Sequence, residues 1–66
     1  MNPEAILLTV EQAAAIVGVS PWTIRKWRTK GQGPRFVRLG GALGTVRYRR
    51  KDLDDFLEAS VVDPAT

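Results

Sequence analysis

The chain has 66 residues, of which 44% are hydrophobic, and a formal net charge of +3. A chain of this length forms one small domain, close to the lower limit for folding without disulfides or metals. It contains no cysteine and no histidine, which excludes disulfides and removes the preferred ligands of structural zinc.

The first predicted helix covers Val10 to about Val17. The preceding "TVEQ" has the form of a capping box, with Thr9 as the cap and the Gln12 side chain reaching back. Apolar positions recur at helical spacing on one face of this helix, whereas Glu11 points outward. Gly18 is a natural helix terminator, because glycine takes the left-handed conformation at little cost.

The second predicted helix covers Pro21 to about Lys30. Ser20 can cap its free N–H groups, and proline fits the first helical turn. A helical wheel puts Thr23, Ile24 and Trp27 on a core face. The opposite face carries Trp22, Arg25, Lys26 and Thr29. Two short helices with a tight glycine-containing turn predict a helix-turn-helix, and the alternative is an ordinary helical hairpin.

The stretch "RFVRLGGALGTVRYR" changes to a period of two and predicts a β-hairpin. Its apolar face would hold Val37, Leu39, Val46 and Tyr48. Its cationic face would hold Arg38, Arg47 and Arg49. With no acidic residue among them, three arginines favour a phosphate-facing wing over a plain solvent-facing hairpin. Phe36 interrupts the alternation and is expected to cover the base of the hairpin.

The last predicted helix covers about Lys51 to Ser60, with Leu53, Phe56 and Leu57 on its apolar face. Its carboxylates begin near the N-terminus, where the helix dipole favours negative charge, and are expected to form a solvated face. A catalytic pair is disfavoured, because nothing apolar surrounds them to shift a pKa. Residues 1–66 form a single domain, in which 1–6 and 61–66 are expected to be a mobile arm and tail.

The charges are segregated along the chain. All ten lysines and arginines lie between Arg25 and Lys51, and no acidic residue lies between Glu11 and Asp52. This pattern predicts binding to a polyanion, with nucleic acid favoured. The alternatives are an acidic membrane or protein surface, or chance. No apolar run approaches the roughly 20 residues of a membrane span, and no signal peptide is indicated, so a cytoplasmic protein is expected.

In this order of elements, the chain resembles the excisionase-type winged helix-turn-helix proteins, relatives of the DNA-binding head of MerR regulators. The resemblance covers roughly Leu7 to Leu57 and rests on "LLTVEQAAAIVGVSPWTIRKW", "GPRFVRLGG" and "VRYRRKDLDDFL". It implies a mainly α fold with a two-stranded β-hairpin wing, that is, a small α+β winged helix-turn-helix. The wing tip "GGALGT" is longer and less basic than in many members. The long coiled-coil helix of MerR regulators is missing, so effector sensing is not implied.

The resemblance also implies where DNA would bind. The outward face of a recognition helix enters the major groove, and Arg25 is the candidate for reading bases, because its planar fork can pair with guanine. Trp22 would pack on a sugar or a thymine methyl, or else fold back over the hairpin and enlarge the core. Trp27 and Thr23 are expected in the core. The other DNA-binding candidates lie at the start of this helix, along it and on the wing: Ser20, Pro21, Lys26, Arg28, Lys30, Arg38, Gly41, Arg47 and Arg49.

The leading hypothesis for function is a phage or mobile-element recombination directionality factor. Such proteins bind several sites in an attachment region, bend the DNA and promote excision by an integrase. Expected partners are double-stranded DNA, an integrase and neighbouring copies on DNA. The protein itself is expected to be a monomer in solution and to associate with the bacterial nucleoid. No catalysis or cofactor is expected, since no serine or tyrosine sits beside an evident base. The alternatives are a small transcription regulator of the same fold and a basic protein-interaction module.

Overall fold

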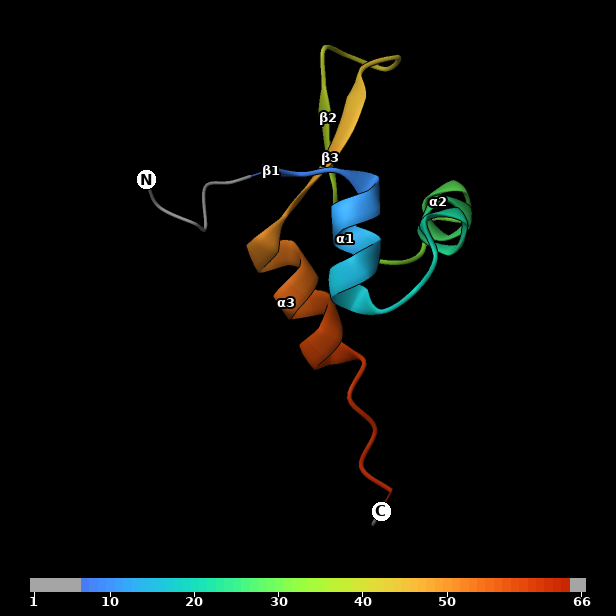
Figure 1. Ribbon diagram of the computed structural model, residues 1–66, viewed down its shortest axis with the longest axis vertical. Coiled ribbons are helices and arrows are strands. Elements are labelled where there is room, and N and C mark those ends of the chain that lie inside the picture. Colours follow the sequence, from blue (N-terminus) through green and yellow to red (C-terminus); the bar gives the residue numbers. More distant parts are fainter. Residues whose placement is uncertain (1–6, 65–66) are drawn as a thin grey trace.

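The computed structural model describes residues 7–64, which form three helices and a three-stranded antiparallel sheet (Figure 1). The elements are β1 (Leu7–Leu8), α1 (Val10–Val17), α2 (Pro21–Thr29), β2 (Val37–Leu39), β3 (Thr45–Arg49) and α3 (Arg50–Ala59). The predicted helices are confirmed to within a residue at each end. The arm predicted at 1–6 lies outside the described residues, as do residues 65 and 66 of the tail.

Side-chain caps set the boundaries of α1 and α2. The Thr9 hydroxyl oxygen accepts the Gln12 backbone N–H at 3.1 Å, and the Gln12 side-chain oxygen accepts the Thr9 backbone N–H at 2.9 Å. This is the predicted capping box. Gly18 ends α1 in the left-handed region, with φ of 86°. Ser20 then caps α2 by accepting the Thr23 backbone N–H at 3.1 Å. Residues 18–20 therefore end one helix and start the next in a single tight turn.

The sheet has the strand order β1-β3-β2, with β3 in the centre. The two-residue β1 pairs Leu7 with Arg49 and Leu8 with Tyr48. Sequence periodicity predicted only two strands, because two adjacent leucines show no alternation. The short strand has a clear role: it fixes the chain just before α1 to the same strand that leads into α3.

The register of the hairpin contradicts the prediction of one apolar and one cationic face. The pairs are Val37–Arg47, Arg38–Val46 and Leu39–Thr45. Directly opposite residues of an antiparallel pair share a face, so Arg38 lies on the face of Val46, whereas Arg47 and Arg49 lie on the other. Apolar and cationic residues alternate along each strand in the sequence, but Leu39 is exposed and Arg47 is half-buried. The five residues between the strands set the register, and alternation within a strand carries no information about it.

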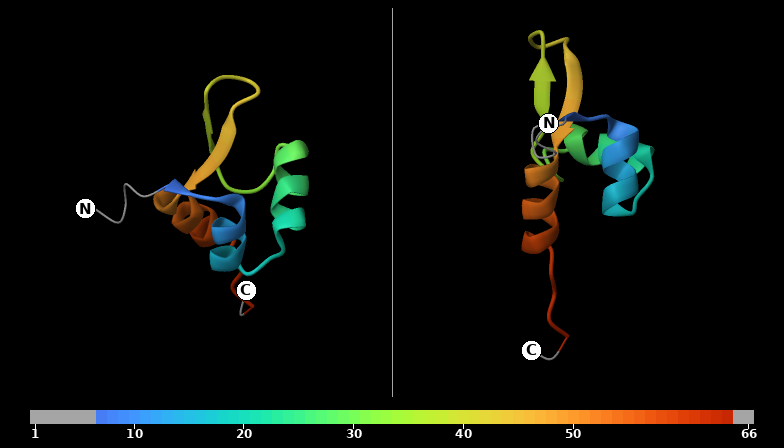
Figure 2. Two further views of the ribbon diagram at one scale, coloured as in Figure 1. Left: turned by 45° about the horizontal axis from the view of Figure 1, so that its top comes forward. Right: turned by 60° about the vertical axis from the view of Figure 1, so that its left-hand side comes forward.

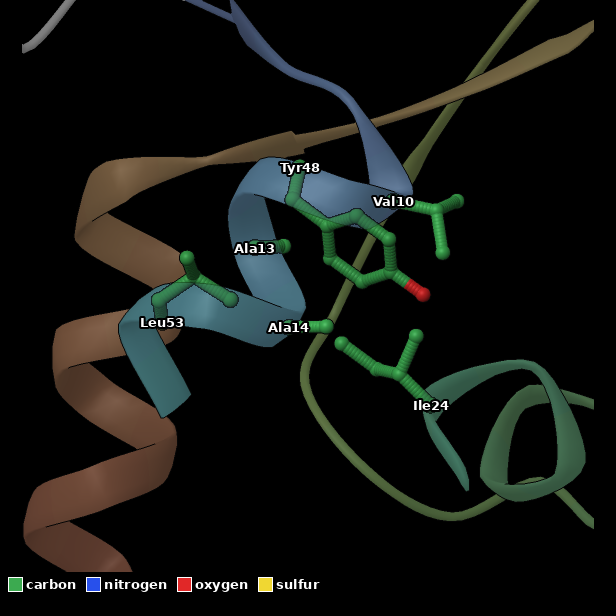
Figure 3. Packing of buried hydrophobic residues seen from close by; sticks show 6 residues of the cluster. All are labelled: Val10, Ala13, Ala14, Ile24, Tyr48 and Leu53. Carbon is green, nitrogen blue, oxygen red and sulfur yellow. The ribbon is translucent and has the colours of Figure 1, made fainter. Parts of the chain in front are cut away.

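In the described part of the chain, six buried residues form the hydrophobic core cluster, and they come from both helices and sheet (Figure 3). They are Val10, Ala13, Ala14, Ile24, Tyr48 and Leu53. The largest that are fully buried are Tyr48 from β3, Ile24 from α2 and Leu53 from α3. The alanines of α1 let the tyrosine ring and the two aliphatic side chains meet at the centre. The wing strand is thus part of the helical core.

The two tryptophans lie in different environments, as predicted. The Trp27 side chain is partly buried against the core, with its ring centroid 5.6 Å from that of Phe56 on α3. Gly33 lies so close that a Cβ there would be 3.0 Å from the Trp27 Cβ. Trp22, in contrast, is 66% exposed. The interpretation in which Trp22 folds over the hairpin is therefore wrong.

Asp52 corrects the expectation that all carboxylates of α3 are solvated. It is only 4% exposed, and it accepts two hydrogen bonds from the Arg49 guanidinium, at 2.6 Å from Nε and 3.0 Å from Nη2. Bidentate pairs of this kind are among the strong charge-assisted contacts. These hydrogen bonds hold the pKa of the Asp52 carboxyl below its ordinary value. The pair connects the last residue of the wing to the first turn of α3.

The arrangement is a winged helix-turn-helix. Helices α1 and α2 form the helix-turn-helix, α3 packs beside α1, and the β2–β3 hairpin projects beyond the helices as the wing (Figure 2). Among residues 7–64, none of the helices is both long and apolar enough to cross a bilayer.

Trp27→Ala should destabilise the domain by about 3 kcal/mol, since truncation of a packed aromatic removes apolar contacts and leaves a cavity. Trp22→Ala should change the free energy of unfolding by less than about 0.5 kcal/mol, because its ring is largely in solvent. Thermal and denaturant melts followed by far-ultraviolet circular dichroism would measure both. A larger effect from Trp22→Ala would contradict this assignment.

Stability should fall in acid through Asp52. Because its folded-state pKa is lowered, the pair contributes fully above the unfolded value of about 3.9, and this contribution is lost as the pH falls through the lower folded value. Asp52→Asn should cost about 1–3 kcal/mol at pH 7 and flatten the profile below pH 4. Urea melts across a pH series would measure this. The control Asp54→Asn, at an exposed carboxylate, should keep the acid dependence; equal flattening in both variants would refute the assignment.

Candidate nucleic-acid interface

The outward face of α2 brings an aromatic ring and several cations together. The Lys26 ammonium lies 5.0 Å from the centre of the exposed Trp22 ring, which is cation–π geometry. A shallow depression on this face is lined by Trp22, Arg25, Lys26, Thr29 and Lys30. Four of the predicted DNA-binding residues thus share one open surface. The Trp22 ring thus presents a flat apolar surface beside these cations and lies under the Lys26 ammonium.

Arg25 on this face is paired with Glu11 of α1. The Arg25 Nη2 donates to a Glu11 carboxylate oxygen at 3.0 Å, and both side chains are about half exposed or more. A hydrogen bond to the backbone of Glu11, and then the one from Arg25, hold the pKa of the Glu11 carboxyl below its ordinary value. An exposed pair contributes little to stability. It does orient the guanidinium, and its hydrogen bond uses only Nη2, so the remaining N–H groups can still reach a ligand.

This pairing also corrects the expected charge distribution. In the sequence Glu11 lies outside the basic segment, but in the structure its carboxylate contacts the cationic face of α2. The acidic side is therefore formed by α3, where Asp54, Asp55 and Glu58 are exposed. Asp54 is itself paired with Arg50 at 3.2 Å.

The start of α2 presents Ser20 and Pro21. The Ser20 hydroxyl caps the helix and also forms a 2.9 Å hydrogen bond with the Thr23 hydroxyl. Thr23 is half-buried, in agreement with its predicted place on the inner face. Ser20 is exposed and Pro21 is half-buried, so the positive end of the helix dipole faces outward at this point.

Arg28 does not join the outward face. Its guanidinium carbon lies 5.8 Å from the centre of the Phe36 ring, at the junction between α2 and the wing. Its Nη1 is buried and has no hydrogen-bond partner among the described residues. Residues 31–36 line a second shallow depression around it. Structure therefore separates Arg28 from the cations with which the sequence grouped it.

The outer part of the wing is braced by Arg38. Its guanidinium carbon lies 5.5 Å from the Phe36 ring centre, and its Nη1 donates to the Ala42 carbonyl at 3.2 Å. Phe36 is in turn 6.2 Å from the buried Tyr48 ring, which confirms its predicted position over the hairpin base. Gly41 lies in the exposed tip with φ of 90°. The tip is thus connected to the core through a continuous series of contacts.

The two remaining wing arginines lie on the opposite face. Arg47 is half-buried and donates from Nη1 to the Val46 carbonyl at 2.8 Å. Arg49 forms the pair with Asp52, and those hydrogen bonds raise the pKa of its guanidinium. Its side chain is still 45% exposed. Arg49 therefore has a structural task besides any contact it makes outside the domain.

Two residues of this surface were not singled out from the sequence. Glu11 was placed correctly on an outward face, but its pairing with Arg25, 14 residues away, has no local sequence signal. Leu43 stands at the wing tip and is 101% exposed. The sequence does contain a signal for Leu43, since it is a large apolar residue between glycines in a tight turn, where polar residues are usual.

A comparison with protein families identifies the chain. The profile described as "Helix-turn-helix domain" matches residues 7–60, most of the chain. The chain belongs to the helix-turn-helix domain family. This family binds DNA and includes excisionase-like proteins. Comparison with curated proteins and with solved structures gives no significant match to either. The chain is thus a DNA-binding helix-turn-helix domain whose second helix, α2, has a cationic outer face.

Proposed function

We propose that the protein is an excisionase, a recombination directionality factor that binds and bends attachment-site DNA so that an integrase carries out excision. One observation carries the proposal: a cationic recognition helix and an arginine-bearing wing are held on one small core, in a family that includes excisionase-like proteins. Such an arrangement can contact a major groove and the flanking backbone together. The protein contributes no catalysis of its own and takes no cofactor.

On the recognition helix, the proposed roles follow from charge and shape. Arg25 reads a guanine through its planar fork, oriented by Glu11. Lys26 and Lys30 contact phosphates, and Trp22 packs on sugar or on a thymine methyl. Ser20 and Pro21 bring the positive end of α2 to a phosphate oxygen. One of these contacts would read a base, and the others would add affinity that does not depend on the DNA sequence.

On the wing side, the proposed contacts are with the backbone on either side of the groove. Arg38 and Arg47 face opposite ways from the hairpin, so they can approach the two strands that border a minor groove. Arg49 and Arg28 contact phosphates nearer the helices, and Gly41 allows the tip to come close. Together these cations supply the salt-dependent part of the affinity.

Neighbouring copies are proposed to meet on the DNA. Asp54, Asp55 and Glu58 of α3 are exposed, and most of the cations lie on α2 and the wing. Copies bound in tandem can place one acidic side against the next basic one, and contacts of this heterologous kind extend along the duplex without closing. The free protein is proposed to be a monomer, since its buried apolar residues form one core.

Electrophoretic shifts on duplexes from the genomic region around the coding gene would test the proposal. Tight binding should show a log–log slope of affinity against salt near −5, from about five or six phosphate contacts at roughly −0.9 each. DNA with adjacent sites should fill cooperatively. Addition of the protein to the neighbouring integrase should raise excision and lower integration. Binding without any effect on recombination would favour the transcription regulator, and a slope shallower than about −2 would contradict the phosphate contacts.

Arg25→Ala should weaken binding to the specific site by about 1–3 kcal/mol and relax discrimination at one base pair. Lys30→Ala should weaken binding to matched and mismatched duplexes equally, because phosphate contacts carry no sequence information. Titrations of both variants against both duplexes would measure the difference. Identical profiles for the two variants would show that the roles are assigned wrongly.

A further inference from the structure

The wing tip presents one apolar side chain entirely to solvent. Leu43 is 101% exposed, the highest value among the large hydrophobic residues exposed in the described part of the chain. A single exposed leucine on a helix surface needs no explanation. This one lies in the turn that joins β2 to β3, and Figure 1 shows that this hairpin projects away from the helices.

The turn that carries Leu43 is well defined. The Gly44 N–H donates to the Gly41 carbonyl at 2.9 Å, which puts Ala42 and Leu43 at the centre of a tight turn. A side chain at Gly44 would collide with the Leu39 carbonyl oxygen, so this close chain reversal requires glycine. The turn leaves the leucine pointing away from the protein on a narrow support of small residues.

The turn is also braced against the core. Arg38 donates to the Ala42 carbonyl at 3.2 Å and packs over Phe36, whose ring contacts the buried Tyr48. Force on the tip would therefore be transmitted to the centre of the fold. A loop that merely connects two strands has no need for such a brace, but a side chain that must separate stacked bases does.

The surroundings of Leu43 indicate which partner it meets. The wing bears Arg38 and Arg47, and the chain has no acidic residue between Glu11 and Asp52, so the tip approaches polyanions readily. A tip built of glycine, alanine and one leucine is slim enough for a minor groove about 6 Å wide. The five residues of β3 span about 17 Å, roughly the half turn of duplex between a major groove and the next minor groove.

We propose that Leu43 is a wedge that enters the minor groove beside the α2 site, inserts between two base pairs and kinks the DNA. The inference rests on the proposed function and supplies the physical means of its bending. Apolar side chains that unstack a base step in this way bend the duplex toward the major groove. The wedge should favour pyrimidine–purine steps, because these unstack most easily. The wing thus selects sequence by deformability, without reading any base edge.

The test compares Leu43→Ala with Leu43→Met and with Val62→Ala, the last an exposed apolar residue outside the wing. The probe is a duplex of about 30 base pairs selected from random DNA by binding to the unaltered protein. Bend angle follows from fluorescence energy transfer between labelled ends, and unstacking from 2-aminopurine placed at successive steps. Thermal melts of each variant check that the fold is intact.

The unaltered protein, Leu43→Met and Val62→Ala should bend the probe equally and brighten 2-aminopurine at one step. Leu43→Ala should lose most of the bend and the brightening, and its Kd should rise roughly tenfold, as expected for burying a few methylene groups fewer. An unchanged bend with Leu43→Ala would overturn the wedge and leave the excisionase proposal standing. Loss of cooperativity between copies with a normal bend would assign Leu43 to protein contacts and also overturn it. No binding to any duplex would defeat both proposals.

Discussion

Burial of the Tyr48 ring is the constraint on which the rest of the molecule depends. Tyr48 belongs to β3, the central strand of the sheet, yet its side chain is 1% exposed among residues of all three helices (Figure 3). The wing is therefore not an appendage that could turn freely on the helix-turn-helix. The angle between α2 and the hairpin is fixed by packing, so a ligand that contacts both would cause little further ordering.

Electrostatic contacts extend this rigidity to the C-terminal end of the wing strand and across the helices. Arg49 and Asp52 join β3 to α3, and Glu11 and Arg25 join α1 to α2. The two pairs differ in kind, since one carboxylate is buried and the other is 64% exposed. The buried pair chiefly stabilises the fold. The exposed pair chiefly orients the Arg25 guanidinium. Because such a pair contributes little free energy, a guanine or a phosphate could replace the carboxylate as its partner with little loss of stability.

The helices and their caps were predictable from sequence because the signals are local. Thr9 with Gln12, Gly18, and Ser20 before proline each act within a few residues, and each is present as predicted. The errors fall where distant parts of the chain decide the outcome. The register of the hairpin puts Arg38 and Arg47 on opposite faces. The burial of Asp52 depends on where the wing ends relative to α3.

The candidate site divides in the same way. The outward grouping of Trp22, Arg25, Lys26 and Lys30 follows from helical spacing alone, and the structure has it. Arg28 lies within one turn of the same residues, but its guanidinium packs against Phe36, a residue of the loop that follows the helix. Helical spacing gives the direction of a side chain, but the neighbour that meets it there depends on tertiary packing.

The central position of β3 has a consequence for how copies of this domain can associate. Both of its edges are occupied, one by β1 and the other by β2. The outer edge of β2 offers only three residues, and it ends in the turn of the wing tip. A ladder that short gives an incoming strand few hydrogen bonds, so continuous sheets between molecules are disfavoured. Copies of this domain can therefore contact one another only through side chains, and such contacts are reversible, whereas association through shared strands leads to fibres.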